Sequence, residues 1–269
     1  MKICKNLIRF FWVLLEIFPI KITYAMKNSK TVCFFSNGLA DTGSQAYRYI
    51  PDFIPFPIYT FNYNDVRFFP SKIPKIRQVN LAQYNDLICF VHEFELFESL
   101  LQLRYKNDYQ IILYGVSRGA SVILLFLALF PEKLSHVSGI VLESPFDSVE
   151  TIIKSKIKSI PCFSLDFGQT VLESIFGQYT RVSTKPRDLV FALPKHIPML
   201  FVCSEKDSLV PKESTLFLYE QCINYSFANV SLFVAHDSKH AKIIYTQFDS
   251  QMYKNTLKIF FKKCVSSEY

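Results

Sequence analysis

Ser117 lies in the pentapeptide Gly115-Val116-Ser117-Arg118-Gly119, which follows a run of strand-forming residues and precedes an apolar helical pattern. A tight turn from strand to helix exposes a serine hydroxyl, and the helix N-terminus favours negative charge beside it. The two glycines lack a Cβ, so neighbouring backbone can approach while the serine accepts a strained conformation. The alternative is that Ser117 only caps the helix. We predict that Ser117 is a nucleophile.

A serine nucleophile requires a base, and the base requires a carboxylate that holds its tautomer. Asp207 follows a predicted strand at 198–203, and His240 follows a predicted strand at 230–235. Since the carboxyl ends of parallel strands share one edge of a sheet, the three side chains are expected to meet there. We predict that His240 transfers protons and that Asp207 orients His240.

Two other residues could take these roles. His236 stands four positions before His240, but a base needs a loop to reach the nucleophile, which favours His240. Asp147 follows the strand after the nucleophile and could supply the carboxylate. We favour Asp147 as the N-cap of a helix that begins at Ser148.

An acyl-transfer site also needs hydrogen-bond donors for the developing oxyanion. We predict that the backbone N–H groups of Leu39 and Arg118 supply them, because Arg118 follows the nucleophile and Leu39 follows the first strand. Gly38 lets that loop approach Ser117. The alternative is that Asn37-Gly38 is only a turn.

Short apolar runs alternate with helical patterns from residue 31 onward, which is typical of a mostly parallel sheet covered by helices on both faces. The sequence predicts an α/β fold with about six strands. Expected strands lie at 31–36, 57–63, 109–114, 137–142, 198–203 and 230–235, and expected helices at 81–105, 120–130, 148–160, 167–179, 212–222 and 241–263. Residues 148–195 interrupt the alternation. We predict one domain, 26–269, with a cap-like helical insertion at 148–195.

Residues 1–25 combine Lys2, Lys5 and Arg9 with an apolar stretch at 10–20 and small residues up to Ala25. This pattern predicts a secretory signal peptide cleaved after Ala25, or an uncleaved anchor at a membrane surface, so the protein would be exported or membrane-associated. The alternative is a buried N-terminal helix in a cytoplasmic protein.

Composition excludes several classes of protein. The chain of 269 residues is 50% hydrophobic and contains 27 Phe and 15 Tyr, which excludes a wholly disordered chain. The net charge of +7 comes from scattered Lys and Arg, so no nucleic-acid partner is predicted. The seven cysteines form no CxxC pair and no zinc pattern, so we expect no metal and interpret them mainly as structural thiols.

Five segments together resemble the α/β-hydrolases, in particular the BEM46-like and serine aminopeptidase-type serine hydrolases. These segments are Asn37-Gly38, Tyr114–Gly119, Leu142–Phe146, Val202–Pro211 and Ser238–His240, and the resemblance covers roughly residues 31–262. It implies hydrolysis of an ester, thioester or amide through an acyl-enzyme, without metal or organic cofactor. Asn37 stands where many members have His.

We therefore predict a serine hydrolase whose substrate is a small acyl compound. The insertion at 148–195 is rich in Phe, Ile and Leu and would form a wall that favours an apolar acyl group. An acyltransferase would use the same residues. The alternative from another class is a non-catalytic binding protein with the same fold.

Overall fold

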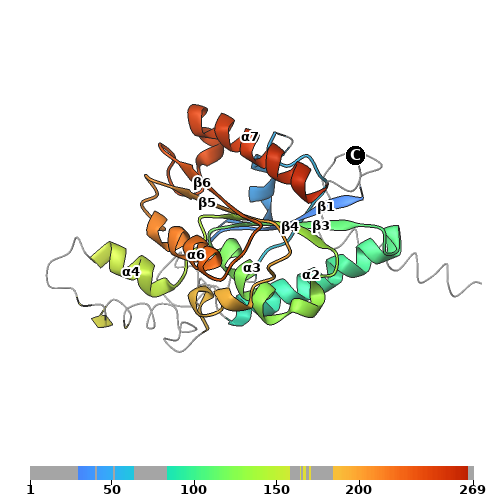
Figure 1. Cartoon of the computed structure of the whole chain (residues 1–269), viewed down its shortest axis with the longest axis horizontal. Coiled ribbons are helices and arrows are strands. Elements are labelled where there is room, and N and C mark those ends of the chain that lie inside the picture. The colour runs from blue at the N-terminus through green and yellow to red at the C-terminus, as the bar shows by residue number, and fades with distance from the viewer. Residues whose placement is uncertain are drawn as a thin grey trace, which may run out of the picture.

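The computed structural model describes residues 30–39, 41–50, 52–63, 84–157, 164, 166–167, 170 and 184–265. Within these residues, six parallel strands form one sheet in the order β2-β1-β3-β4-β5-β6 (Figure 1). The strands are β1 (Thr31–Ser36), β2 (Ile58–Thr60), β3 (Gln110–Val116), β4 (Val137–Glu143), β5 (Met199–Ser204) and β6 (Val230–Ala235). This arrangement confirms the predicted α/β sheet of about six strands.

The chain reverses its path across the sheet between β1 and β3. From β1 it moves outward to β2 and then returns to place β3 on the opposite side of β1. In an open parallel sheet such a reversal leaves a crevice at the carboxyl ends of the two strands. Gly38 follows β1 and Ser117 follows β3. The topology alone therefore brings these two loops to the same edge of the sheet.

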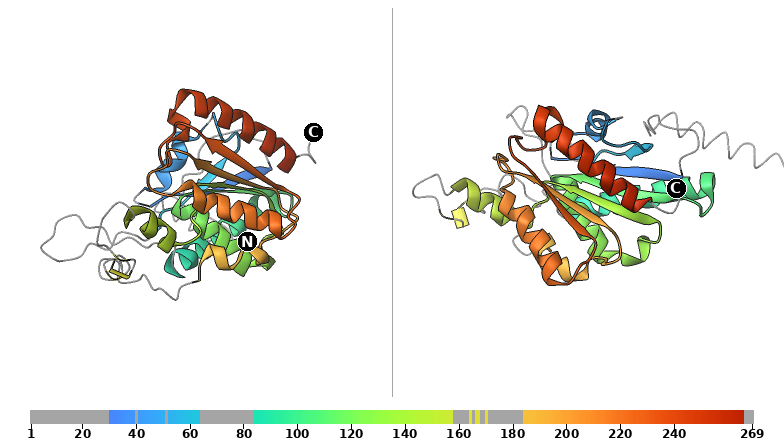
Figure 2. Two further views of the ribbon diagram at one scale, coloured as in Figure 1. Left: turned by 60° about the vertical axis from the view of Figure 1, so that its left-hand side comes forward. Right: turned by 45° about the horizontal axis from the view of Figure 1, so that its top comes forward.

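Helices cover both faces of the sheet (Figures 1 and 2). One face carries α2 (Tyr84–Tyr105), α3 (Arg118–Leu129) and α6 (Lys212–Asn224). The other face carries α7 (Gln247–Cys264) and the short 3-10 helix η1 (Gly43–Arg48). α4 (Val149–Ile157) lies beside α6 and away from the sheet in both figures. The molecule is a three-layer sandwich with a core on each side of the sheet.

Strand residues alternate between the two cores. In β1, Val32 and Phe34 face the core under α2 and α3, whereas Cys33 and Phe35 face the core under α7. Successive side chains of a strand point to opposite faces, and both faces are covered here. That is why all six residues of β1 are buried and why the sequence shows a continuous apolar run.

Phenylalanine fills much of the core under α2. The ring of Phe34 lies 5.1 to 5.4 Å, between centroids, from five other rings, which come from β2, the segment after it and α2. Aromatic pairs at this separation add a stabilising interaction to the burial of apolar area. The high phenylalanine content of the chain thus has a structural role at this position.

The described elements match most of the expected ones, but two differ clearly in their bounds. The strand expected at 57–63 is β2, which ends at Thr60. The expected helix at 241–263 begins at Gln247, because residues 236–246 form a loop and the 3-10 helix η5 (Ile243–Tyr245). Ala241 has a φ of 51°, a left-handed conformation that interrupts a right-handed helix. Buried thiols, which include Cys33 and Cys203, occur free in the core.

Two predictions fall wholly or largely outside the described residues. The segment at 1–25 lies outside them, as does most of the helix expected at 167–179. The described parts of the insertion at 148–195 are α4, η3 (Pro186–Asp188), η4 (Val190–Ala192) and a few residues between them. No helix in the described part of the chain is long and apolar enough to span a bilayer.

Replacing the central ring of this core tests the packing. Phe34→Ala removes a fully buried side chain and leaves a cavity, so the free energy of unfolding should fall by about 3–5 kcal/mol in urea denaturation. Phe191→Ala is the matched control, because the Phe191 residue is 60% exposed; its effect should be about 0.5 kcal/mol or less. Equal losses in the two variants would contradict this description of the core.

Candidate active site

The turn that carries Ser117 is strained and tightly packed. Ser117 has φ 54° and ψ −114°, a conformation that costs free energy for a residue with a side chain. A Cβ built on Gly119 would lie 2.2 Å from the carbonyl oxygen of Ser36, and one on Gly115 would lie 2.6 Å from the Cα of Ala120. Both glycines are required because backbone occupies the space of a side chain, as the sequence predicted.

Ser117, His240 and Asp207 form a continuous hydrogen-bonded row. The Oγ of Ser117 lies 2.9 Å from Nε2 of His240, and Nδ1 of His240 lies 2.7 Å from Oδ2 of Asp207. The hydroxyl of Ser117 makes no capping hydrogen bond to α3, so the alternative that Ser117 only caps this helix is not observed. Because a carboxylate only accepts hydrogen bonds, Nδ1–H donates to Asp207 and Nε2 is left to accept from Ser117.

The carboxylate of Asp207 is fixed on both oxygens. Its Oδ1 accepts from the backbone N–H groups of Leu209 and Val210, at 2.9 Å each. Its Oδ2 accepts from His240 and also from Oγ of Ser144, at 3.1 Å. The Asp207 side chain is 1% exposed and that of His240 is 16% exposed. The Nδ1 side of the imidazole is therefore held by a buried carboxylate, while part of the ring stays exposed to solvent.

The competing histidine and aspartate lie in other contacts. Nδ1 of His236 lies 3.3 Å from a carboxylate oxygen of Glu205, and both side chains are exposed. The Asp147 carboxylate accepts from Ser214 and pairs with Arg187 at 2.5 Å. Neither residue has a hydrogen bond to the row described above.

The predicted N-cap role of Asp147 is wrong. α4 begins at Val149, and Oγ of Ser148 accepts from the backbone N–H of Thr151 at 3.2 Å, which is the N-cap contact. Asp147 is buried, and its carboxylate is satisfied by side chains from α4, α6 and the segment near residue 187. Its position two residues before α4 is too early to cap the helix.

The loop after β1 lies against the nucleophile turn. A Cβ built on Gly38 would lie 3.6 Å from the Cβ of Ser117, and the N–H of Gly38 donates to Oε1 of Gln45 at 2.8 Å. The side-chain amide of buried Asn37 donates to the carbonyl groups of Gly38 and Asp41. Leu39 follows directly in this fixed loop. Its role as an oxyanion donor, and that of Arg118, stay predictions.

The side chain of Arg118 has a structural contact that the sequence did not indicate. It is 1% exposed, and one guanidinium nitrogen donates to the carbonyl oxygen of Gly38 at 3.3 Å. A second nitrogen lies 4.0 Å from a carboxylate oxygen of Asp86, and the guanidinium carbon lies 4.1 Å from the Tyr63 ring centroid. The first residue after the nucleophile thus carries a buried cation that contacts both the loop after β1 and α2.

Glu143 is the last residue of β4 and is fully buried beneath the site. The hydroxyl of Tyr49 donates to both carboxylate oxygens, at 3.0 and 3.1 Å, and those of Tyr114 and Tyr253 lie 3.1 and 3.3 Å from Oε2. Burial raises the pKa of Glu143 to about 7, although the tyrosine hydrogen bonds oppose the shift. We call these four residues the glutamate–tyrosine cluster.

Asp249 holds the loop that presents His240. This buried residue of α7 accepts from the backbone N–H groups of His236 and Asp237 and from Oγ of Ser238, at 2.6 to 3.0 Å. Burial alone would raise its pKa, but these hydrogen bonds outweigh burial and lower it. Asp249 lies nine residues after His240 on the next helix, where a sequence pattern gives no sign of a contact back to the loop.

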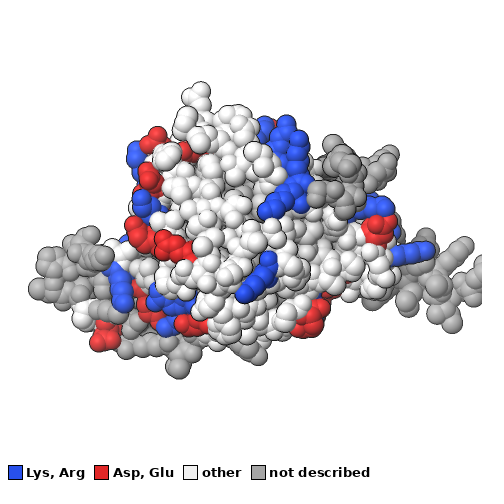
Figure 3. Space-filling view, in the orientation of Figure 1, with Lys and Arg blue, Asp and Glu red and all other residues white. Residues whose placement is uncertain are grey.

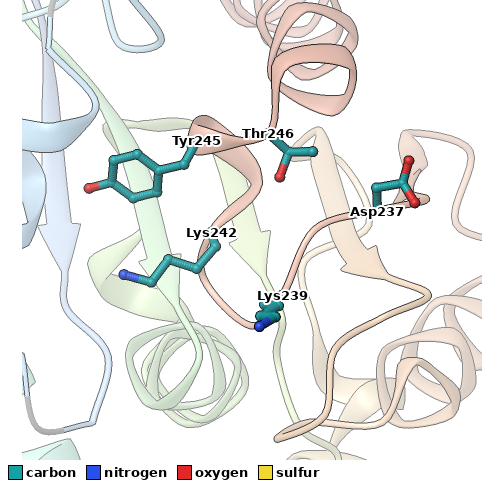
Figure 4. Close-up of a pocket in the computed structure, with 5 residues that line it drawn as sticks. All are labelled: Asp237, Lys239, Lys242, Tyr245 and Thr246. Carbon is teal, nitrogen blue, oxygen red and sulfur yellow. The ribbon is translucent and has the colours of Figure 1, made fainter.

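A recess of about 420 Å³ lies beside the His240 loop. It is lined by Asp237, Lys239, Lys242, Tyr245 and Thr246, which Figure 4 shows around the loop and the start of α7. None of the residues of the hydrogen-bonded row lines it. On the face shown in Figure 3, acidic and basic side chains are interspersed along one margin and do not form a stripe of one sign. Within the described residues, no group of three or more His, Cys, Asp or Glu could hold a metal ion.

No family model matches the chain, and no curated protein matches it. Solved structures do. The esterase Pf2001 of Pyrococcus furiosus is similar with a TM-score of 0.62 and 16% identity, over 88% of this chain and 83% of the esterase. A monoacylglycerol lipase from Paleococcus ferrophilus is similar with a TM-score of 0.55 and 12% identity, over 86% and 94% of the two chains. The chain has the α/β-hydrolase fold.

A lipase-esterase related protein from Clostridium acetobutylicum shares this α/β-hydrolase fold at a TM-score of 0.56 and 12% identity, over 88% and 96% of the two chains. Likeness at this level of identity concerns the fold. The predicted resemblance to α/β-hydrolases is confirmed at that level. The narrower resemblance to BEM46-like and serine aminopeptidase-type proteins stays a prediction.

Titration of Glu143 should make stability depend on pH. Folding raises the pKa of Glu143 from 4.5 to about 7, so the folded protein binds the proton more tightly than the unfolded chain does. The stability that this proton contributes is therefore lost as the pH rises from the unfolded pKa through the folded pKa. The free energy of unfolding of the wild type, relative to Glu143→Gln, should fall by roughly 3 kcal/mol between about pH 4 and pH 9. Urea denaturation of both proteins measures this. A pH-independent difference would contradict the assignment.

Removing the buried cation should destabilise the protein strongly. Arg118→Met leaves the carboxylate of Asp86 buried without this cation and should lower the free energy of unfolding by about 3–5 kcal/mol. Adding Asp86→Asn should recover part of the loss. Arg48→Met breaks the partly exposed pair with Asp41 and should cost about 1 kcal/mol or less. A loss no larger for Arg118→Met than for Arg48→Met would contradict this role.

Proposed function

We propose that the protein is a serine hydrolase that cleaves an ester, thioester or amide through an acyl-enzyme. The observation that carries the proposal is the row from Ser117 through His240 to Asp207, with contacts of 2.9 and 2.7 Å. These are the distances at which a histidine can take a proton from a serine while a carboxylate fixes the imidazole. The strained turn at Ser117 and the α/β-hydrolase fold support the same function.

The proposed reaction follows from the tautomer of His240, in which Nε2 accepts the proton of Ser117. Oγ of Ser117 attacks the substrate carbonyl carbon as its proton passes to Nε2 of His240, which gives a tetrahedral intermediate with a negative oxygen. The imidazolium then protonates the leaving alcohol, thiol or amine as its bond to carbon breaks. Water attacks the acyl-enzyme in the same way, with His240 as base, and the acid product leaves with Ser117 restored. Asp207 stabilises the imidazolium throughout.

The negative oxygen requires donors that are already in place. We assign this role to the backbone N–H groups of Leu39 and Arg118. The closeness of Gly38 to Ser117 supports the assignment, as do the bonds that hold this loop. Because the donors belong to a fixed loop and a helix N-terminus, little reorganisation would accompany the charge.

We propose an apolar acyl group for the substrate, because the sequence of the insertion at 148–195 is rich in Phe, Ile and Leu. The insertion at 148–195 leaves the sheet after β4 and returns near Arg187, whose backbone N–H donates to the carbonyl oxygen of Asp147 at 3.1 Å. Within it, Lys156 of α4 donates to the carbonyl oxygen of Ser208, which follows Asp207 directly. Both contacts hold the described ends of the insertion near the segments that carry Asp147 and Asp207, which supports a role for the insertion as a wall of the site.

Loss of the nucleophile should abolish turnover without loss of fold. Ser117→Ala should lower kcat on p-nitrophenyl esters by at least a factor on the order of 10³. Its free energy of unfolding should stay near that of the wild type. Spectrophotometric release of p-nitrophenol over a series of chain lengths measures both activity and acyl preference. Wild-type protein that is inactive on esters, thioesters and anilides alike, or a fully active variant, would contradict the proposal.

Substitutions of the base and of the acid should affect turnover far more than substitutions of the competing histidine and aspartate. His240→Ala should lower kcat by about 10³-fold, whereas the control His236→Ala removes an exposed ring and should change kcat less than about threefold. Asp207→Asn should lower kcat by up to about 10⁴-fold, because an amide favours the wrong imidazole tautomer. Asp147→Asn should lower stability and largely spare kcat. The reverse ranking in either pair would overturn that assignment.

A further inference from the structure

Two consecutive residues at the end of β4 connect the nucleophile turn to the acid. The carbonyl oxygen of Glu143 accepts from the backbone N–H of Ser117 at 2.7 Å. The next residue, Ser144, donates its hydroxyl to Oδ2 of Asp207 at 3.1 Å. These two neighbouring residues therefore contact both the turn that carries Ser117 and the carboxylate of Asp207.

The backbone of Ser144 is held in an unusual conformation. Its φ is 49°, in the left-handed region, and the residue is 2% exposed. Its N–H still donates to the carbonyl oxygen of Val202 on the neighbouring strand, at 2.8 Å. Strained conformations of this kind persist where the surrounding structure fixes them. At Ser144 the conformation coincides with a hydroxyl bonded to the carboxylate of Asp207.

The glutamate–tyrosine cluster holds this strand end from below. Its tyrosines come from three separate elements: Tyr49 follows η1, Tyr114 lies on β3 and Tyr253 lies on α7. The hydroxyls of Tyr114 and Tyr253 also contact each other at 2.5 Å. Rotation or sliding of the end of β4 would break several buried hydrogen bonds at once, and such losses are costly.

Ser144 is one of the donors that hold the Asp207 carboxylate in its orientation. The two backbone donors, Leu209 and Val210, contact Oδ1. The oxygen that faces His240 is Oδ2, and the hydroxyl of Ser144 is its second donor. Without Ser144, the described hydrogen bonds of Oδ2 reduce to the one that it makes to the imidazole.

We propose that Ser144 is a positioning residue for the Asp207–His240 pair, and that the glutamate–tyrosine cluster holds it in place. The proposal rests on the proposed serine hydrolase for its effect on turnover, but the hydrogen bond that it concerns exists without substrate. Ser144 acts through Asp207 and does not contact the reacting atoms.

Nuclear magnetic resonance tests the positioning without turnover. The Nδ1–H proton of an imidazole hydrogen-bonded to a carboxylate gives a far-downfield resonance, and the His240→Ala variant identifies it. In Ser144→Ala this resonance should move upfield or broaden by exchange with water. Ser214→Ala is the matched control, because it removes another buried serine hydroxyl that donates to an aspartate, Asp147. The resonance should not change in the control.

Kinetics gives the second readout. With p-nitrophenyl acetate, Ser144→Ala should lower kcat about tenfold and leave KM within about twofold, because a hydrogen bond to a charged group is lost while the substrate contacts stay. Ser144→Gly also lacks the hydroxyl but relieves the strain at φ 49°, so it should lose as much activity as Ser144→Ala while unfolding less readily.

Four outcomes would overturn the positioning role. These are a wild-type spectrum without the resonance, a resonance unchanged in Ser144→Ala, an equal change in Ser214→Ala, and full activity in Ser144→Gly. A wild type that shows the resonance and its loss in Ser144→Ala but hydrolyses nothing would support the positioning role and refute the proposed function.

Discussion

The hydrogen bond from the N–H of Ser117 to the carbonyl oxygen of Glu143 is the contact on which the site depends. It extends the pairing of β3 with β4 by one residue, into a turn whose backbone is strained. The register of two paired strands fixes where each strand ends relative to its neighbour. Because Ser144 follows in the same chain and contacts Asp207, the register of β3 on β4 also sets how far the acid lies from the nucleophile.

Buried polar groups surround the site. Glu143 is a carboxylate among tyrosines, Arg118 and Asp86 form a buried pair, and Asp249 is buried under the His240 loop. Replacing a buried ion pair by apolar residues often leaves a protein equally stable or more so. Arg118 contacts the loop after β1, Asp249 holds the loop after β6, and Glu143 connects the end of β4 to three tyrosines. All three therefore contribute to the geometry of the site.

The sequence predicts the elements well because the inner strands β1, β3, β4 and β5 are buried on both faces and each helix has an apolar side. The turn at Ser117 could also be predicted, since its two glycines and its place between strand and helix are local features. The glutamate–tyrosine cluster could not. Its partners lie 29, 94 and 110 residues from Glu143, and only the folded sheet brings them together. The predicted N-cap at Asp147 was wrong by one residue: Ser148, which is also a good N-cap residue, holds that position.

Reaction of the intact protein with a fluorophosphonate tests the central claim, that His240 activates Ser117 as a nucleophile, most directly. Mass spectrometry of the intact chain and of its peptides measures the stoichiometry and the modified residue. We predict one adduct per chain, on Ser117, in the wild type, and a labelling rate at least about 10²-fold lower in His240→Ala. A folded wild type that gains no adduct, or an adduct on another serine, would contradict the account.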